Sequence, residues 1–94
     1  MVHLLFVKLT PEVEWRTWRA ARRVWGGQVC VQSAPDIETA LAIVQRQSPY
    51  EYATRPSLVM LETGAHSAWE PKAVEQLHSL LERQRVPLVG MADT

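Results

Sequence analysis

The sequence predicts a single α/β domain built on a parallel β-sheet. Short apolar segments alternate with amphipathic segments of helical period, in the order βαβαβαβ. The apolar segments are too hydrophobic to belong to a sheet with one face in water, so helical crossovers should cover both faces. With 94 residues, 47% of them hydrophobic, the chain is long enough for one core and too short for a second. We therefore expect one domain over residues 1–94.

The first strand and the first helix have clear boundaries. Val2–Leu9 is apolar, with four large hydrophobic residues in a row at positions 4 to 7, as in a central strand covered on both faces. Thr10 is a good helix N-cap, and Pro11 suits the first helical position. The helix should run to Trp25, because the Gly26-Gly27 pair favours a helix end.

The second unit follows the same order. Gln28–Gln32 is short, rich in valine and bounded by turn residues, which predicts a second strand. The segment from Pro35 to about Gln47 then predicts a helix, because its apolar residues form one stripe at helical spacing: Ile37, Ala40, Leu41 and Val44. Residues 48–56 hold two prolines and show no hydrophobic period, so they predict a loop.

The last units complete the predicted sheet. Leu58–Leu61 predicts a third buried strand. Ser67 and Glu70 have the spacing of a capping box, and Pro71 suits the first turn of a helix that should run to about Arg85. The apolar segment Val86–Met91 predicts the fourth strand.

Composition argues against several classes of function. Ten basic and ten acidic residues give zero formal charge, which weakens the case for nonspecific binding to DNA or anionic membranes. No apolar run approaches the roughly 20 residues of a membrane span, and no basic leader is present, so we expect a cytoplasmic protein. The single cysteine, Cys30, should be a small buried hydrophobic residue. His3, His66 and His78 lack ligand spacing, so neither a metal nor a cofactor is expected.

Three segments resemble the receiver domains of response regulators. Residues 56–63, Pro-Ser-Leu-Val-Met-Leu-Glu-Thr, are similar to the family's third strand, in which Pro-Asp-Leu and three apolar residues lead to the phosphoacceptor aspartate. Residues 86–92, Val-Pro-Leu-Val-Gly-Met-Ala, are similar to its fourth strand, and Ser33–Val44 is similar to its second helix with the preceding turn. The resemblance implies a flavodoxin/receiver-like three-layer sandwich with strand order 2-1-3-4 and three helices. It also implies that the fifth βα unit of a receiver is missing.

Every position that carries chemistry in a receiver differs in this sequence. Lys8 and Leu9 stand where the family has the acidic pair that holds Mg²⁺. Glu62 stands at the phosphoacceptor position, and Ala92 at the hydroxyl position after the fourth strand. The family's lysine belongs to the missing fifth strand. The resemblance therefore implies a pseudo-receiver in signal transduction that is neither an enzyme nor dependent on phosphorylation.

The first helix carries the candidate surface for a protein partner. Trp15, Trp18 and Trp25 spread its apolar residues over an arc of roughly 200°, wider than one sheet contact requires. We expect the sheet-facing positions to be Val13, Ala20 and Val24, which leaves tryptophans on the side where a receiver's fifth helix would pack. Tryptophan beside arginine, here Arg22, is typical of protein interfaces.

The fourth strand is an edge in the order 2-1-3-4, and its Leu88 and Gly90 lie on an uncharged stretch that can pair with another chain. We therefore predict a protein partner, either another signalling protein or a second copy in a homodimer. Two alternatives stay open. The tryptophans can fold over the sheet edge to complete an undersized core. A strip of arginines can instead contact nucleic acid in a small transcriptional regulator: Arg16, Arg19, Arg22 and Arg23.

Overall fold

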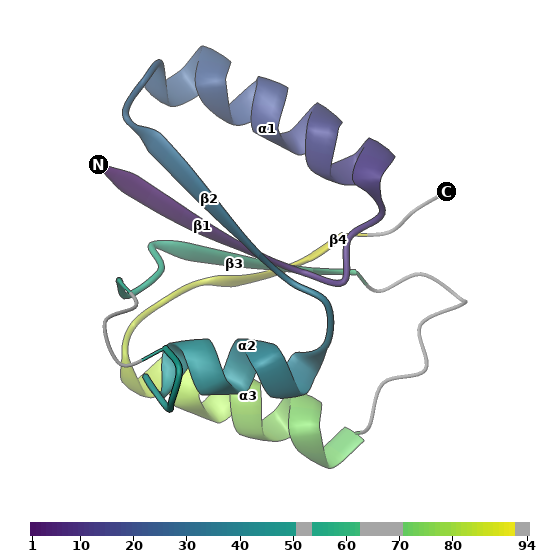
Figure 1. The fold of residues 1–94 in the computed structure, drawn as a ribbon, viewed down its shortest axis with the longest axis vertical. Coiled ribbons are helices and arrows are strands. Elements are labelled where there is room, and N and C mark those ends of the chain that lie inside the picture. The colour runs from purple at the N-terminus through teal and green to yellow at the C-terminus, as the bar shows by residue number, and fades with distance from the viewer. Residues whose placement is uncertain (51–53, 63–70, 92–94) are drawn as a thin grey trace.

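The computed structural model describes residues 1–50, 54–62 and 71–91. These residues form a four-stranded, all-parallel sheet with the strand order β2-β1-β3-β4, together with three helices (Figure 1). The predicted α/β fold with order 2-1-3-4 is thus confirmed. The elements, in chain order, are β1 (Val2–Val7), α1 (Pro11–Trp25), β2 (Val29–Ala34), α2 (Ile37–Val44), β3 (Leu58–Glu62), α3 (Pro71–Arg83) and β4 (Leu88–Met91).

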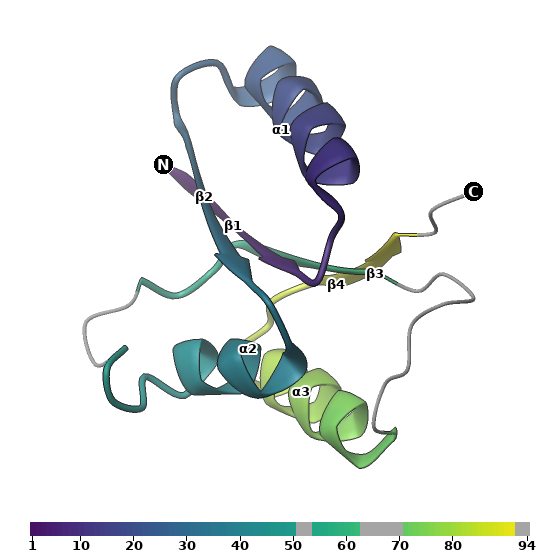
Figure 2. The same cartoon turned by 45° about the vertical axis from the view of Figure 1, so that its right-hand side comes forward.

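The helices divide between the two faces of the sheet. α1 lies on one face, and α2 and α3 lie side by side on the other (Figures 1 and 2). This three-layer arrangement is what parallel strands with helical crossovers produce. It leaves the α1 face less completely covered: Leu58 and Met60 of β3 are half-buried there, and Val89 of β4 is 39% exposed.

β1 is the centre of the molecule. It pairs with β2 over its whole length and with β3 from Leu4 to Val7, whose side chains are at most 1% exposed. Because side chains alternate along a strand, Leu4 and Phe6 join the cluster under α1, and Leu5 and Val7 join the cluster under α2 and α3. The run of four hydrophobic residues in the sequence thus supplies both halves of the core.

Local hydrogen bonds set the helix boundaries. Thr10 Oγ1 accepts a bond from the Val13 N–H at 3.3 Å, and α1 ends at Trp25 as predicted. α2 and α3 end in Schellman motifs whose left-handed residues are Arg46 (φ 54°) and Arg85 (φ 57°). These motifs make both helices shorter at their C-terminal ends than the sequence predicted.

Other boundaries move for equally local reasons. α2 begins at Ile37 instead of Pro35, because Asp36 is its N-cap. β2 continues two residues past the predicted end at Gln32, because its pairing with β1 extends to Ala34. β1 stops at Val7, since Lys8 has a left-handed backbone (φ 55°). The predicted capping box at residues 67–70 lies outside the described residues.

The N-cap of α2 gives the fold a measurable pH dependence. Hydrogen bonds from the side chain and the N–H of Thr39 lower the pKa of Asp36, and the N–H bond is 2.7 Å long. Because the folded-state pKa is depressed, the cap is complete above the ordinary value of about 3.9 and is lost as the pH falls through the folded-state pKa. We expect Asp36→Ala to cost about 1 kcal/mol at neutral pH, measured by urea denaturation.

Asp36→Asn is the matched control, because asparagine caps a helix without titrating. The difference in stability between the wild type and Asp36→Asn should change between pH 5 and pH 2 and stay constant between pH 5 and pH 8. A constant difference down to pH 2 would show that the carboxylate does not serve as the cap.

Candidate interaction surface

The orientation of α1 decides which of its side chains are available to a partner. Val13 and Ala21 are buried on the sheet, and Thr17 between them is half-buried. The predicted contacts of Ala20 and Val24 are wrong: Ala20 is exposed, and Val24 is 72% exposed. Val24 lies on the same side of the helix as Val13. The apolar cluster beneath the helix includes Val13 and Ala21 but does not extend to the last turn, so among the described residues Val24 has no apolar cluster to pack against there.

Two tryptophans on α1 form one unit on the surface. The rings of Trp15 and Trp18 stack with centroids 5.5 Å apart and planes 24° apart. Trp15 is 56% exposed, and Trp18 is half-buried. The guanidinium carbon (Cζ) of Arg19 lies 5.8 Å from the ring centroid of Trp15, and that of Arg22 lies 5.1 Å from the ring centroid of Trp18. We call these four residues the tryptophan surface. Its aromatic rings and guanidinium groups are the residue types that dominate the binding energy of protein interfaces.

The tryptophan surface continues onto β2, an edge strand of the sheet. Trp15 and Trp18 line a hollow of about 280 Å³ with Phe6, Pro11, Glu14 and Val31. Val31 is 36% exposed, and Ser33 Oγ donates a hydrogen bond to Glu14 Oε1 at 3.0 Å. Helix side chains and strand edge therefore form one contiguous, partly apolar surface.

The other predicted partner residues lie elsewhere. Trp25 is 38% exposed at the C-terminal end of α1. Leu88 and Gly90 are on β4, at the opposite edge of the sheet from β2, and Leu88 packs toward the α2 and α3 face. The structure therefore brings Trp15, Trp18 and Arg22 together and leaves the β4 residues at a separate place.

Two of the four positions that were compared with receiver chemistry, Lys8 and Glu62, lie at the carboxyl ends of neighbouring strands. Lys8 and Glu62 follow directly after Val7 and Leu61, which are paired across β1 and β3. The two residues therefore lie at the same end of these neighbouring strands. Leu9 turns into the cluster under α1 and is 8% exposed, which makes it a core residue. Ala92 lies outside the described residues. Among the described residues, no group of three or more His, Cys, Asp or Glu side chains could hold a metal ion.

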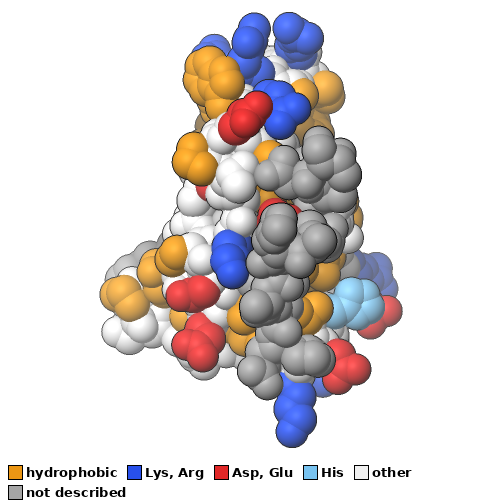
Figure 3. Space-filling model, turned by 90° about the vertical axis from the view of Figure 1, so that its right-hand side faces the viewer, with side chains coloured by type: hydrophobic (Ala, Val, Ile, Leu, Met, Phe, Trp, Pro, Cys, Tyr) orange, Lys and Arg blue, Asp and Glu red, His pale blue; other side chains and the backbone are white. Residues whose placement is uncertain are grey.

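The arginine strip is partly engaged within the helix. Figure 3 shows basic side chains gathered over α1 at one end of the molecule, with hydrophobic side chains beside them. Arg16 pairs with Glu12 at 3.5 Å, and Arg19 and Arg22 lie over indole rings. A hollow of about 200 Å³ is lined by Arg16, Arg19, Ala20 and Arg23.

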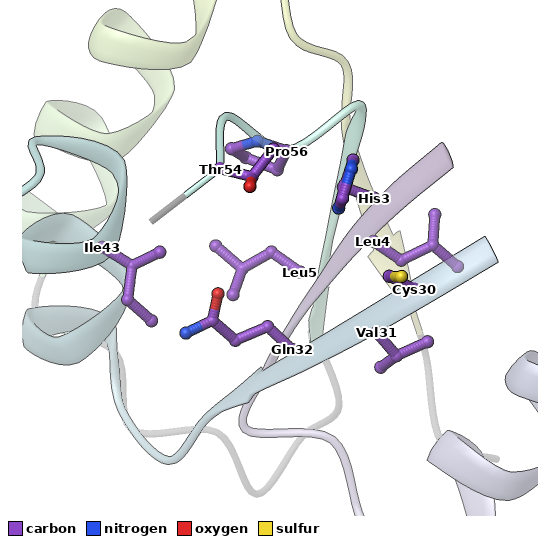
Figure 4. A pocket seen from close by; sticks show the side chains of 9 residues that line it. All are labelled: His3, Leu4, Leu5, Cys30, Val31, Gln32, Ile43, Thr54 and Pro56. Atoms are coloured by element: carbon purple, nitrogen blue, oxygen red, sulfur yellow. The ribbon is translucent and has the colours of Figure 1, made fainter. Parts of the chain in front are cut away.

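A third hollow, of about 320 Å³, lies at the amino ends of β1 and β2 (Figure 4). Leu5, Ile43 and Gln32 line its side toward α2. Within the described part of the chain, no hydrogen bond joins its polar side chains, those of His3, Cys30, Gln32 and Thr54, to one another. Cys30 is at its margin. The expectation that Cys30 is buried is wrong: it is an exposed free thiol, with its Sγ 3.0 Å from Met1 Sδ. The edge position of β2 explains this exposure, because no strand of the described residues pairs on its outer side.

Comparisons with known proteins identify no relative. No family model, no curated protein and no solved structure matches the chain. Among the described residues, no helix is both long enough and apolar enough to cross a membrane.

Proposed function

We propose that this chain is a non-catalytic module for protein–protein interaction, a pseudo-receiver that acts in cytoplasmic signal transduction without being phosphorylated. The tryptophan surface is its binding site, and the exposed edge of β2 extends that site. Resemblance to receivers supports the signalling role, and the match between the predicted and observed strand order supports the resemblance.

The main support for the proposal is the stacked pair formed by Trp15, which is exposed, and Trp18, which is half-buried. Neither buried cluster of the core includes Trp15 or Trp18, so the tryptophans are not needed to fill it. Large aromatic rings left partly in water are costly unless a partner covers them. The arginines above the rings add planar, weakly hydrated cations that suit a protein interface.

The residue types at positions 8, 9 and 62 support a non-enzymatic role. A phosphoacceptor site needs a divalent cation held by carboxylates near the acceptor, and Leu9 is instead part of the core. We expect no incorporation of label from acetyl phosphate in the presence of Mg²⁺.

The test of the binding site compares two charge insertions on one helix. Trp18→Glu places a carboxylate inside the proposed contact, and we expect it to weaken binding of a protein partner by at least about a hundredfold. Val24→Glu is the matched control, because Val24 is exposed on α1 away from the tryptophan pair. Both variants are immobilised and compared with the wild type for capture of proteins from the native cell, followed by titration of each captured protein. Equal binding by all three chains would contradict the proposed site.

The arginine strip supports nucleic-acid binding less well. Arg16 has an acidic neighbour within ion-pair distance, and the indole rings already engage Arg19 and Arg22. A strip of phosphate contacts would show a steep fall of affinity with salt. We expect no such dependence on duplex or single-stranded DNA, and a steep slope that Arg23→Ala reduces would favour the nucleic-acid role instead.

A further inference from the structure

The open edge of β2 has the features of a strand that pairs with another chain. All six residues of β2 pair with β1 without a bulge, and the strand contains neither proline nor a charged residue. Four consecutive positions, from Cys30 to Ser33, are exposed. Proteins usually protect such edges with charges, prolines or bulges. β4, at the other edge, is four residues long and includes Gly90, which makes it the weaker template.

The hydrogen bonds to β1 show which peptide groups of β2 face outward. The Val2 N–H donates to Gln28 O and the Lys8 N–H donates to Ala34 O, both at 2.8 Å. Peptide groups alternate in direction along a strand, so the even-numbered residues of β2 direct their N–H and C=O groups toward β1. Val29, Val31 and Ser33 therefore direct their N–H and C=O groups to the open edge.

We infer that the occupant of this edge is a second copy of the chain, with the two β2 strands antiparallel about a two-fold axis at Val31. In this register Val31 faces its own counterpart and Val29 faces Ser33 of the partner, so the outward peptide groups of all three residues are paired. The two sheets then join into one continuous sheet. This inference deepens the proposed function, because it names the partner and the geometry.

The charges of α1 favour the same arrangement. Glu14 is held over Ser33 at one end of β2, and the N–H of Gln28 at the other end donates to Trp25 O. α1 therefore runs opposite to β2, and the two-fold axis brings the Glu14 end of one α1 toward the Arg22 end of the other. Glu14, Trp18 and Arg22 are four residues apart and share one side of the helix. Glu14 and Arg22 thus give the surface charges that are complementary to those of a second copy.

The first experiment compares two edge valines of similar exposure on the same face of the sheet. Val31 and Val89 are 36% and 39% exposed, on β2 and β4 respectively. Sedimentation equilibrium should give the wild type twice the mass of one chain. Val31→Lys places two like charges opposite each other and should raise the dissociation constant by about a hundredfold or more, whereas Val89→Lys should leave it unchanged. A monomeric wild type at high concentration, or disruption by Val89→Lys alone, overturns the inference.

A covalent test is independent of any loss of stability in the variants. In the proposed register Cys30 faces Gln32 of the partner in a non-hydrogen-bonded pair, whose Cα atoms are about 4.5 Å apart, within disulfide range. Gln32→Cys should therefore give a disulfide-linked dimer on mild oxidation. The matched control is Ser33→Cys, whose side chain is on the other face of the sheet and should not cross-link to Cys30. Equal cross-linking by both variants would show a different register and contradict the inference.

Charge reversal tests the contribution of α1. Glu14→Arg and Arg22→Glu should each weaken the dimer about tenfold, and the two changes combined in one chain should restore most of the affinity. Losses that simply add in the double variant would contradict the antiparallel α1 arrangement. A monomeric wild type that still binds another protein through Trp18 would overturn the homodimer and leave the proposed function standing. If the wild type is a dimer and Trp18→Glu weakens no protein contact, the homodimer stands and the proposed function is contradicted.

Discussion

Replacing Phe6 with alanine is expected to destabilise the protein by about 3–5 kcal/mol and to release α1 from the sheet before the rest unfolds. Phe6 is 1% exposed and is the largest side chain in the cluster under α1, which has five buried members: Leu4, Phe6, Leu9, Val13 and Ala21. For a chain of 94 residues the total stability is about 5–14 kcal/mol at roughly 0.05–0.15 kcal/mol per residue, so the sheet survives the change when the wild type lies above the lower end of that range.

Two optical probes separate these events. Three of the four tryptophans lie on α1, so fluorescence reports mainly on the docking of that helix, whereas far-UV circular dichroism reports on the whole fold. In Phe6→Ala the fluorescence transition should occur at lower urea than the dichroism transition, and in the wild type the two should coincide. Val24→Ala, at an exposed position, should change stability by less than about 0.5 kcal/mol. Coincident transitions in Phe6→Ala would show that the two faces of the sheet unfold as one unit.

Local sequence signals predicted the elements well because their causes are local. Thr10, Pro11 and the glycines after Trp25 define α1 by capping and backbone preference, and the structure confirms both ends. The apolar run in β1 indicated a strand buried on both faces, and it is. Strand order came from the resemblance to receivers, and the observed order agrees with it.

Burial at the margins of the sheet was harder to predict, because it depends on which neighbours reach a residue. Cys30 lies in a valine-rich segment that reads as buried, yet β2 is an edge and the thiol is exposed. Val24 shares the helical phase of Val13 but lies outside the cluster beneath α1. The sequence did contain one signal for the β2 edge, since Gln32 and Ser33 are polar residues in what proved to be the same strand.

Replacing Leu77 with alanine should have a different signature, because Leu77 belongs to the larger cluster that joins α2 and α3 to the sheet. It is 0% exposed in α3 and shares this cluster with Leu5 and Val59 of the two central strands. A loss of about 2–5 kcal/mol is expected, with fluorescence and dichroism shifting together to lower urea, since α1 has no sheet to pack on once β1 and β3 separate. The neighbouring variant His78→Ala, at an exposed position, should leave both transitions in place. If Leu77→Ala shifted the dichroism transition alone, α1 with its tryptophan surface would have to be stable without the layer beneath the sheet, and the central role assigned to β1 would be wrong.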